Sequence, residues 1–240
     1  MKISLKRKID FTEVDSELVL TLHSLIKMLQ EAAIRHSNQV DCKSKQQIKG
    51  QSAWILYQYG IEIHKLAFYE EDIEIVTWHR GIKGFKAYRE FEIYSGKTKI
   101  ATASAAYLYY DIKTQKILSI PENIDTIYSV EDQSAFKEDL GQWKLIPRFN
   151  HDFDTSITTR LSDYDPMGHV NNSVYFDYIE TMLFSYLNKE RTIKKIKIQY
   201  TKEITKCVKI LKAGLIKDGF VYRFKLFNEN KTFAFGEIEV

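Results

Sequence analysis

Polar and apolar positions follow the same order in both halves of the chain. Residues 1–15 alternate between the two kinds, which is typical of a half-buried strand. From His23 to Arg35 apolar side chains recur every three or four residues, which indicates an amphipathic helix. After a polar stretch at 36–51, aromatic-rich segments predict strands separated by glycine turns. These strands are expected at 53–63, 72–79, 86–94 and 99–111.

The second half predicts the same elements. A strand at 153–161 leads into a polar turn at 162–168 and a helix at 172–188. Further strands are expected at 194–200, 208–217, 221–228 and 232–240. Helices this apolar need a sheet surface to cover them. The predicted fold class is therefore α+β, with two tandem hot-dog domains, each a long helix wrapped by a curved antiparallel sheet. An unrelated α+β fold with a chance half-repeat is the alternative.

The segment between the repeats has little strand pattern. It contains Pro121 and Pro147 and the acidic pair Glu131-Asp132. We therefore expect an N-terminal domain at 1–120, a linker at 121–150 and a C-terminal domain at 151–240.

Composition and charge narrow the class of protein. The chain has 240 residues, of which 44% are hydrophobic and 28% charged, as in ordinary globular proteins. The net charge of +3 is too small to indicate a nucleic-acid partner. No apolar stretch approaches the ~20 residues that span a bilayer, and the N-terminus lacks the apolar core of a signal peptide. The two cysteines have no metal-ligand spacing. We expect a cytoplasmic protein with no membrane insertion, no metal and no cofactor.

The most specific stretch precedes the second helix. It reads Leu161-Ser-Asp-Tyr-Asp-Pro-Met-Gly-His-Val-Asn-Asn-Ser-Val-Tyr175. Glu203 follows in the segment Tyr200-Thr-Lys-Glu203, far enough along the chain to leave room for the helix and one strand. Hydrolysis needs groups that activate water, transfer protons and stabilise an oxyanion. Two carboxylates, a histidine and a glycine turn before a helix can supply these groups.

This stretch resembles the active-site motif of hot-dog thioesterases, in which an Asp is followed by Gly-His-Val-Asn-Asn and then a Tyr. Glu203 resembles the acidic residue that acyl-acyl carrier protein thioesterases place on the next strand. Leu29-Gln-Glu-Ala-Ala33 and the run from Ser104 to Pro121 resemble the first-repeat helix and closing strand of that family. The resemblance implies hydrolysis of fatty acyl-acyl carrier protein, which releases free fatty acid and ends chain elongation.

One position departs from the family. Met167 stands where the plant enzymes have an Asn, and a thioether cannot supply the hydrogen bonds of an amide. The departure puts in doubt how the catalytic work is divided.

The residue types fit thioester hydrolysis. Asp165 and Glu203 are the candidate base or nucleophile, and either can serve. Two nearby carboxylates raise the pKa of one of them. His169 can orient water or carry a proton. The N–H groups from Gly168 to Val170 are expected to face the carbonyl oxygen at a helix N-terminus. The predicted substrate-binding positions in this stretch are Met167, Gly168, Asn171 and Asn172.

Each candidate also has a structural explanation. Asp165, Asn171 and Asn172 are residue types that cap helices and form turns. Glu203 alone fits a solvent-facing strand position. The first half has no Asp-x-x-x-His sequence, and its equivalent stretch is taken as 16–23. We therefore expect the first half to shape an acyl tunnel, although the same side chains would also serve as ordinary core. The expected tunnel residues are Leu25, Met28, Leu29, Ala32 and Trp54.

An acidic acyl carrier protein needs a basic docking site. A lysine cluster near Glu203 in the sequence is the candidate: Lys194, Lys195, Lys197, Lys202 and Lys206. The phosphates of coenzyme A would suit the same lysines, so an acyl-CoA thioesterase is the first alternative. A non-catalytic acyl-binding hot-dog protein is the second. The repeat allows either a monomer with an internal pseudo-dimer or a homodimer.

Overall fold

The computed structural model describes residues 1–40, 52–145, 147–188, 193–229 and 231–240. Part of the polar stretch expected at 36–51 therefore lies outside the described residues, as does Cys42. The chain forms two compact units, Met1–Gln142 and Trp143–Val240. Among the described residues no helix is long and apolar enough to cross a membrane.

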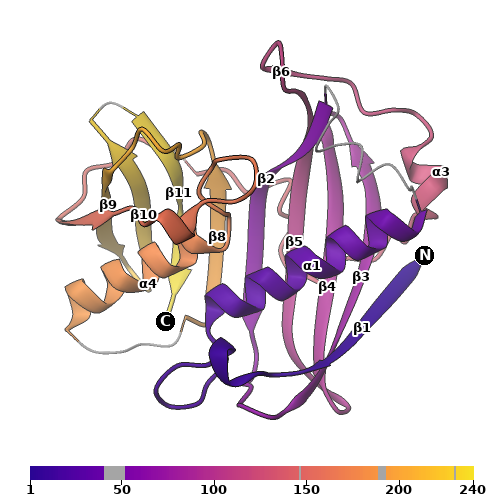
Figure 1. Cartoon of the computed structure of the whole chain (residues 1–240), viewed down its shortest axis with the longest axis horizontal. Helices are drawn as coiled ribbons and strands as arrows, with labels where there is room; N and C mark the ends of the chain where they lie inside the picture. The colour runs from indigo at the N-terminus through magenta and orange to yellow at the C-terminus, as the bar shows by residue number, and fades with distance from the viewer. Residues whose placement is uncertain (41–51, 146, 189–192, 230) are drawn as a thin grey trace. The chain divides into compact units, whose positions relative to one another are not determined.

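The first unit consists of a long helix, α1, and an antiparallel set of strands ordered β1-β3-β4-β5-β2 (Figure 1). A short strand, β6, pairs with β5. The bounds are β1 Lys2–Lys8, α1 Leu22–Val40, β2 Ser52–Ile63, β3 Asp72–Lys83, β4 Lys86–Ser95, β5 Thr98–Asp111, β6 Lys116–Ile117 and α3 Ile124–Tyr128. A 3-10 turn, η1, spans Phe11–Glu13. The residues expected to extend the first strand therefore turn towards α1.

Helix α1 is longer than its apolar period predicted. The expected end was Arg35, because polar residues follow it in the sequence. His36 is nevertheless buried, and its Nδ1 lies 2.8 Å from a guanidinium nitrogen of Arg89 on β4. This buried contact carries the helix one turn further into the unit.

Part of the segment predicted as a linker packs into the first unit. Phe136 and Leu140 are buried. The buried Glu90 carboxylate accepts from the backbone N–H groups of Ala135 (3.0 Å) and Phe136 (3.4 Å). A Cβ at Gly60 would lie 2.7 Å from the Phe136 ring, so glycine makes room for that ring. The boundary between the units therefore falls at Gln142, inside the predicted linker.

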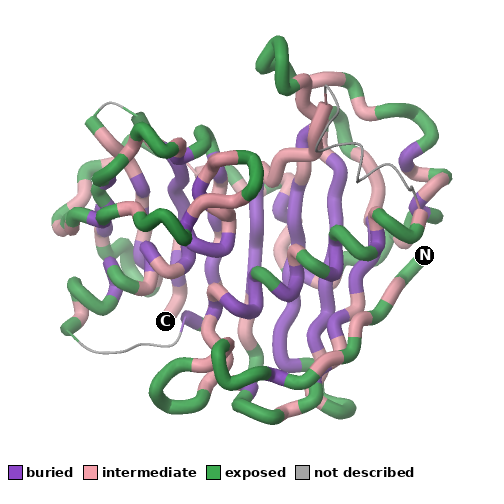
Figure 2. The backbone as a smooth tube through the Cα atoms, in the orientation of Figure 1, coloured by how far each residue is buried: buried purple, intermediate pink, exposed green. Residues whose placement is uncertain are grey.

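The second unit repeats the plan with helix α4 and strands ordered β8-β11-β10-β9-β7 (Figure 1). The bounds are β7 Phe153–Thr158, η2 Leu161–Asp163, α4 Val174–Leu187, β8 Lys195–Tyr200, β9 Ile210–Asp218, β10 Val221–Asn228 and β11 Lys231–Glu239. In each unit the residues between helix and strands are buried (Figure 2). The predicted arrangement of one helix on an antiparallel sheet is confirmed in both.

The ends of two elements differ from the prediction for local reasons. Strand β7 stops at Thr158 because 161–163 turns into η2, held by the buried carboxylate of Asp163. Helix α4 begins at Val174 because Asn171 forms the turn before it, accepting from the N–H of Ser173 through Oδ1. It ends at Leu187, and the capping residue Asn188 has a left-handed conformation (φ 51°) that suits asparagine.

Candidate active site

The segment 164–173, called here the motif loop, is a closed turn between η2 and α4. The N–H of Asp165 donates to the carbonyl of His169 (2.8 Å), and the N–H of Gly168 donates to the carbonyl of Asp165 (2.9 Å). Gly168 has φ +81°, a left-handed conformation that glycine adopts without strain. The loop is therefore fixed by its own backbone.

Asp165 also holds the loop with its side chain. Its Oδ1 accepts from the N–H groups of Met167 (2.8 Å) and His169 (3.2 Å). Sequence alone allowed either a turn role or a chemical role for Asp165, and the turn role is present in the geometry. These two hydrogen bonds use one oxygen of the carboxylate, Oδ1.

Strand β8 carries Glu203 to this loop. The N–H of Val170 donates to the carbonyl of Ile204 (2.9 Å), and His169 forms a β-bridge with Thr205. Glu203 is exposed, and His169 is half-buried. This short backbone pairing therefore joins the segment that contains Glu203 to the motif loop, which contains Asp165 and His169.

Tyr175 lies in the first turn of α4, and the charges of both carboxylates act on its hydroxyl. Burial raises the pKa of its hydroxyl well above the ordinary value. The N–H of Ile204, which is placed to donate to the hydroxyl oxygen, lowers this pKa, whereas the charges of Glu203 and Asp165 raise it further. Tyr175 is the last residue of the motif, and the sequence alone predicts no role for it.

The amides expected to face the substrate carbonyl are already in use. The N–H groups of Gly168, His169 and Val170 donate to Asp165 O, Asp165 Oδ1 and Ile204 O, respectively. That expectation is therefore wrong, because the tight turn consumes these donors. The next amides are bound as well: Asn171 to Asp163 O, Ser173 to Asn171 Oδ1 and Val174 to Asn171 O. Of the backbone amides from Met167 to Val174, only that of Asn172 has no acceptor among the described residues.

The two asparagines thus have different surroundings. The Asn171 side chain accepts from the N–H and the hydroxyl of Ser173, so it forms the turn that precedes the N-cap of α4. The carbonyl of Asn172 accepts from the hydroxyl of Tyr200 at 3.3 Å. Met167 is 45% exposed and contributes its backbone N–H to the loop.

A buried carboxylate that the sequence analysis did not single out supports the loop from behind. Asp163 accepts from the hydroxyl of Tyr178 on α4 (2.5 Å) and from Nε of Arg160 (2.9 Å). Burial, followed by the bond to Asp163, raises the pKa of Tyr178 well above its ordinary value. The sequence offers one indication of this contact: Tyr178 follows Tyr175 by one helical turn and therefore lies on the same face of α4.

The first unit contains the same loop with different side chains. Asp15 Oδ1 accepts from the N–H groups of Glu17 and Val19, both at 2.9 Å, and the N–H of Leu20 donates to Ala67 O at 2.9 Å. A 3-10 turn precedes each loop. The counterpart of the motif loop therefore begins at Asp15, one residue before the stretch assigned from sequence.

The predicted tunnel residues belong to the first unit. Most of them are fully buried on the face of α1 that packs on the strands: Leu25, Met28, Leu29 and Ala32. Trp54, on β2, is half-buried, with its ring 5.0 Å from that of Tyr109. This is the packing expected of a core, and a role in lining a tunnel stays a prediction.

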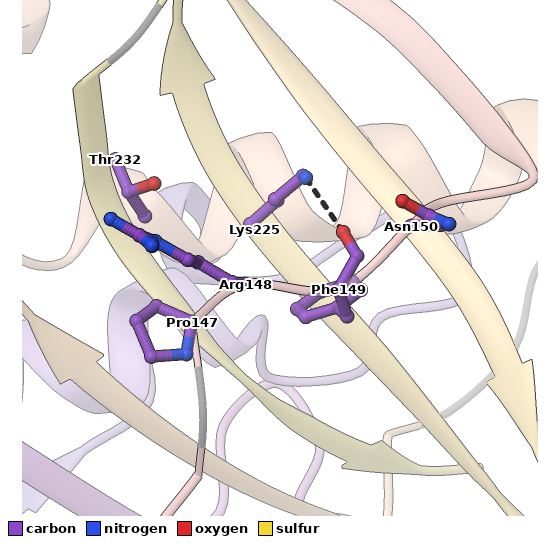
Figure 3. Close-up of a pocket in the computed structure, with 6 residues that line it drawn as sticks. All are labelled: Pro147, Arg148, Phe149, Asn150, Lys225 and Thr232. Carbon is purple, nitrogen blue, oxygen red and sulfur yellow. Dashed lines mark hydrogen bonds between the residues drawn. The ribbon is translucent and has the colours of Figure 1, made fainter.

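Two shallow pockets lie in the second unit, and neither is lined by a residue of the motif loop. The first has a volume of about 420 Å³ and is lined by Pro147, Arg148, Phe149, Asn150, Lys225 and Thr232 (Figure 3). Its Lys225 Nζ donates to the carbonyl of Phe149 at 2.9 Å. The second is lined by 210–212, 227–229 and Ser156. Among the described residues no group of three or more His, Cys, Asp or Glu is placed to hold a metal ion.

The five candidate docking lysines differ in their surroundings. Lys194 is exposed, and its Nζ donates to the carbonyl of Val240 at 3.4 Å. Lys195 and Lys197 lie 3.8 and 3.3 Å from carboxylates of Glu239 and Glu237 on the neighbouring strand. Lys202 and Lys206 are exposed on either side of Glu203 in sequence. Lys206 Nζ lies 5.8 Å from the Tyr164 ring, so it stands beside the motif loop.

Comparisons with known proteins agree with this architecture. Residues 2–128 match the family model of the acyl-ACP thioesterase N-terminal domain, and 147–238 match that of the C-terminal domain. A chloroplastic acyl-[acyl-carrier-protein] hydrolase of Cuphea viscosissima is 19% identical over 80% of this chain and 49% of its own length. An Arabidopsis thaliana oleoyl-acyl carrier protein thioesterase is 22% identical over 80% of this chain and 57% of its own. The chain spans about half the length of these curated relatives.

Solved structures share the fold. A 12:0-ACP thioesterase from Umbellularia californica superposes with a TM-score of 0.85 at 16% identity, covering 99% of this chain and 96% of its own. An acyl-ACP thioesterase from Bacteroides thetaiotaomicron gives a TM-score of 0.85 at 16% identity, covering 99% and 97%. These similarities confirm the predicted double hot-dog fold.

Proposed function

Because this chain belongs to the acyl-ACP thioesterase family, we propose that it hydrolyses the thioester of fatty acyl-acyl carrier protein. The products are free fatty acid and carrier protein with a free thiol, which ends chain elongation. The observation that carries the proposal is the pairing of the motif loop with the segment after β8, which brings His169 and Glu203 together beside the N-terminus of α4.

Glu203 is the better candidate for the base. Its carboxylate is exposed, where water can reach it, whereas one oxygen of Asp165 already binds two backbone amides. In this mechanism Glu203 takes a proton from water as the water oxygen attacks the thioester carbon. The C–S bond then breaks, and the leaving thiolate takes a proton from His169.

The amide of Asn172 is the donor that can meet the developing oxyanion. It is unbound in the described chain and lies at the N-terminus of α4, where the helix dipole favours negative charge. Asp165 then has two roles: its Oδ1 holds the loop, and its negative charge takes part in the chemistry of the site. Met167 needs only its backbone for its bond to Asp165, so the departure from the plant sequence leaves this loop unchanged.

Surface charge indicates how the carrier protein would dock. Lys202 and Lys206 are the exposed lysines that an acidic carrier protein would meet beside Glu203. An acyl-CoA substrate is the alternative, since its phosphates suit the same lysines. We also propose that the first unit holds the acyl tunnel and that the protein acts in fatty acid biosynthesis in the cytoplasm. It would do so as a monomer or a homodimer.

The test is thiol release from acyl-acyl carrier protein and from acyl-CoA, side by side and across chain lengths. We expect faster release from the carrier protein. Glu203→Gln keeps the shape of the side chain and should lower turnover by ~10²-fold or more. Release from acyl-CoA alone would overturn the substrate class. A Glu203→Gln variant with wild-type turnover would overturn the assignment of the base, and binding without turnover would favour the non-catalytic alternative.

A further inference from the structure

Two buried tyrosines meet behind the proposed site. The rings of Tyr175 and Tyr200 stand edge to face, with centroids 5.1 Å apart and planes at 77°. Both residues are largely buried, at 2% and 8% exposure. One comes from the first turn of α4 and the other from the last residue of β8. The pair therefore joins the helix to the strand that leads to Glu203.

Each hydroxyl contacts a different peptide of the site. The Tyr200 hydroxyl donates to the carbonyl of Asn172 at 3.3 Å, next to the amide proposed to meet the oxyanion. The Tyr175 hydroxyl faces the N–H of Ile204, the residue after Glu203. The carbonyl of Ile204 already accepts from Val170. The Ile204 residue is thus held from the loop on one side and from α4 on the other.

The first unit shows that packing does not require these hydroxyls. Leu25 has the same spacing from Asp15 as Tyr175 has from Asp165, and it is equally buried. Ile63 is the counterpart of Tyr200, since the next residue in each unit donates to the backbone of the adjoining strand: His64 to Ile100 O, and Thr201 to Phe233 O. An aliphatic residue therefore fills each place in the unit whose loop has Val19 instead of His169.

We propose that Tyr175 and Tyr200 are positioning residues of the thioesterase site, which fix the backbone at Glu203 and at Asn172 by their hydroxyl groups. This inference rests on the proposed function and deepens it. Neither tyrosine needs to touch the substrate. Their effect is to hold the base and the oxyanion donor at a fixed separation, and small displacements of such groups cost rate more than they cost binding.

The experiment removes each hydroxyl alone. Tyr175→Phe and Tyr200→Phe keep the edge-to-face ring contact, so the fold is expected to remain. We expect kcat for acyl-acyl carrier protein to fall about tenfold in each, as the loss of one positioning hydrogen bond implies. KM should change less than twofold. Tyr222→Phe is the matched control, because Tyr222 is a buried tyrosine of the same unit on β10 and its ring packs on Tyr186.

A second measurement reports on the bonds without activity. Hydrogen exchange of the Ile204 amide should quicken in Tyr175→Phe and stay unchanged in Tyr222→Phe. If the Tyr175 and Tyr200 variants keep wild-type kcat while Glu203→Gln is inactive, the positioning role is overturned and the proposed function stands. Unchanged exchange at Ile204 would also overturn the role of Tyr175. A wild-type protein that hydrolyses neither thioester would overturn both proposals.

Discussion

The motif loop and its counterpart in the first unit share a backbone and differ in chemistry. In both, an aspartate Oδ1 binds two amides ahead of it. The residue after the loop's β-bridge then donates to a carbonyl in the segment that follows a strand, Val170 to Ile204 O after β8 and Leu20 to Ala67 O after β2. At the places of His169 and Glu203, the first unit has Val19 and Leu66. The aspartate is therefore part of how this fold turns into its helix, whatever chemistry follows.

The comparison separates support from function within one molecule. What two loops share is explained by the need to satisfy backbone groups in a tight turn. What one loop has alone requires another explanation. By this criterion His169, Glu203, Tyr175 and Tyr200 form the group that distinguishes the second unit, and Asp165 belongs partly to each class.

Matched substitutions at the two aspartates give the largest expected effect. Asp165→Asn keeps an oxygen for the two amides and removes the charge, so we expect turnover to fall by ~10²-fold with little change in stability. Asp165→Ala should lose about 1 kcal/mol of stability as well. Asp15→Asn and Asp15→Ala are the controls, with the same changes in stability and near wild-type turnover. Thiol-release kinetics and thermal unfolding of the four variants test this prediction. Equal turnover in Asp165→Asn and wild type would show that Asp165 only holds the loop.

The buried histidine of α1 is expected to make the first unit sensitive to acid. Burial, with the nearby charge of Arg89, lowers the pKa of His36 to about 3. A lowered pKa stabilises the fold above the unfolded value of about 6.5, and this contribution is lost as pH falls towards 3. Its size is on the order of a few kcal/mol. His36→Asn keeps an acceptor for Arg89 and removes the titration.

Urea unfolding of wild type and His36→Asn between pH 7 and pH 3 checks this prediction. The variant should lose stability less steeply as the pH falls. Parallel curves would show that the acid sensitivity arises elsewhere. Tyr186 stands at the corresponding position of α4 and is 37% exposed, so Tyr186→Asn serves as the control in the second unit.

The smallest effect concerns the left-handed residue of each loop. Leu18 has φ 61° where Gly168 has φ 81°. A side chain in this conformation costs ~1 kcal/mol, and Leu18 is 44% exposed, so little packing offsets the cost. Leu18→Gly should therefore raise the free energy of unfolding by up to ~1 kcal/mol, and Gly168→Leu should lower it by a similar amount. Denaturant midpoints that move in the opposite directions would contradict the comparison of the two loops.

Much of the fold could be predicted because its periodicity is strong. The five strands predicted for the first unit begin within one residue of their expected positions, whereas the short β6 was not predicted, and α4 ends just before Asn188 as the sequence indicates. Less of the candidate site could be predicted from the sequence. The counterpart loop at Asp15 does not follow from the Asp-x-x-x-His pattern, because the first loop retains only the Asp. Hydrogen bonds of individual amides, such as those of Gly168 and Asn172, depend on the turn geometry and leave no pattern in the sequence.

The burial of Glu90 determines where the protein can be divided. Its carboxylate is satisfied by Ser104 (2.7 Å) and by the amides of Ala135 and Phe136. A fragment ending at residue 120 would leave this acid without its amide donors and empty the space that Gly60 provides for the Phe136 ring. A fragment ending at residue 142 keeps both. Studies of the first unit in isolation should therefore retain these additional residues, even though the family match to the N-terminal domain ends at residue 128.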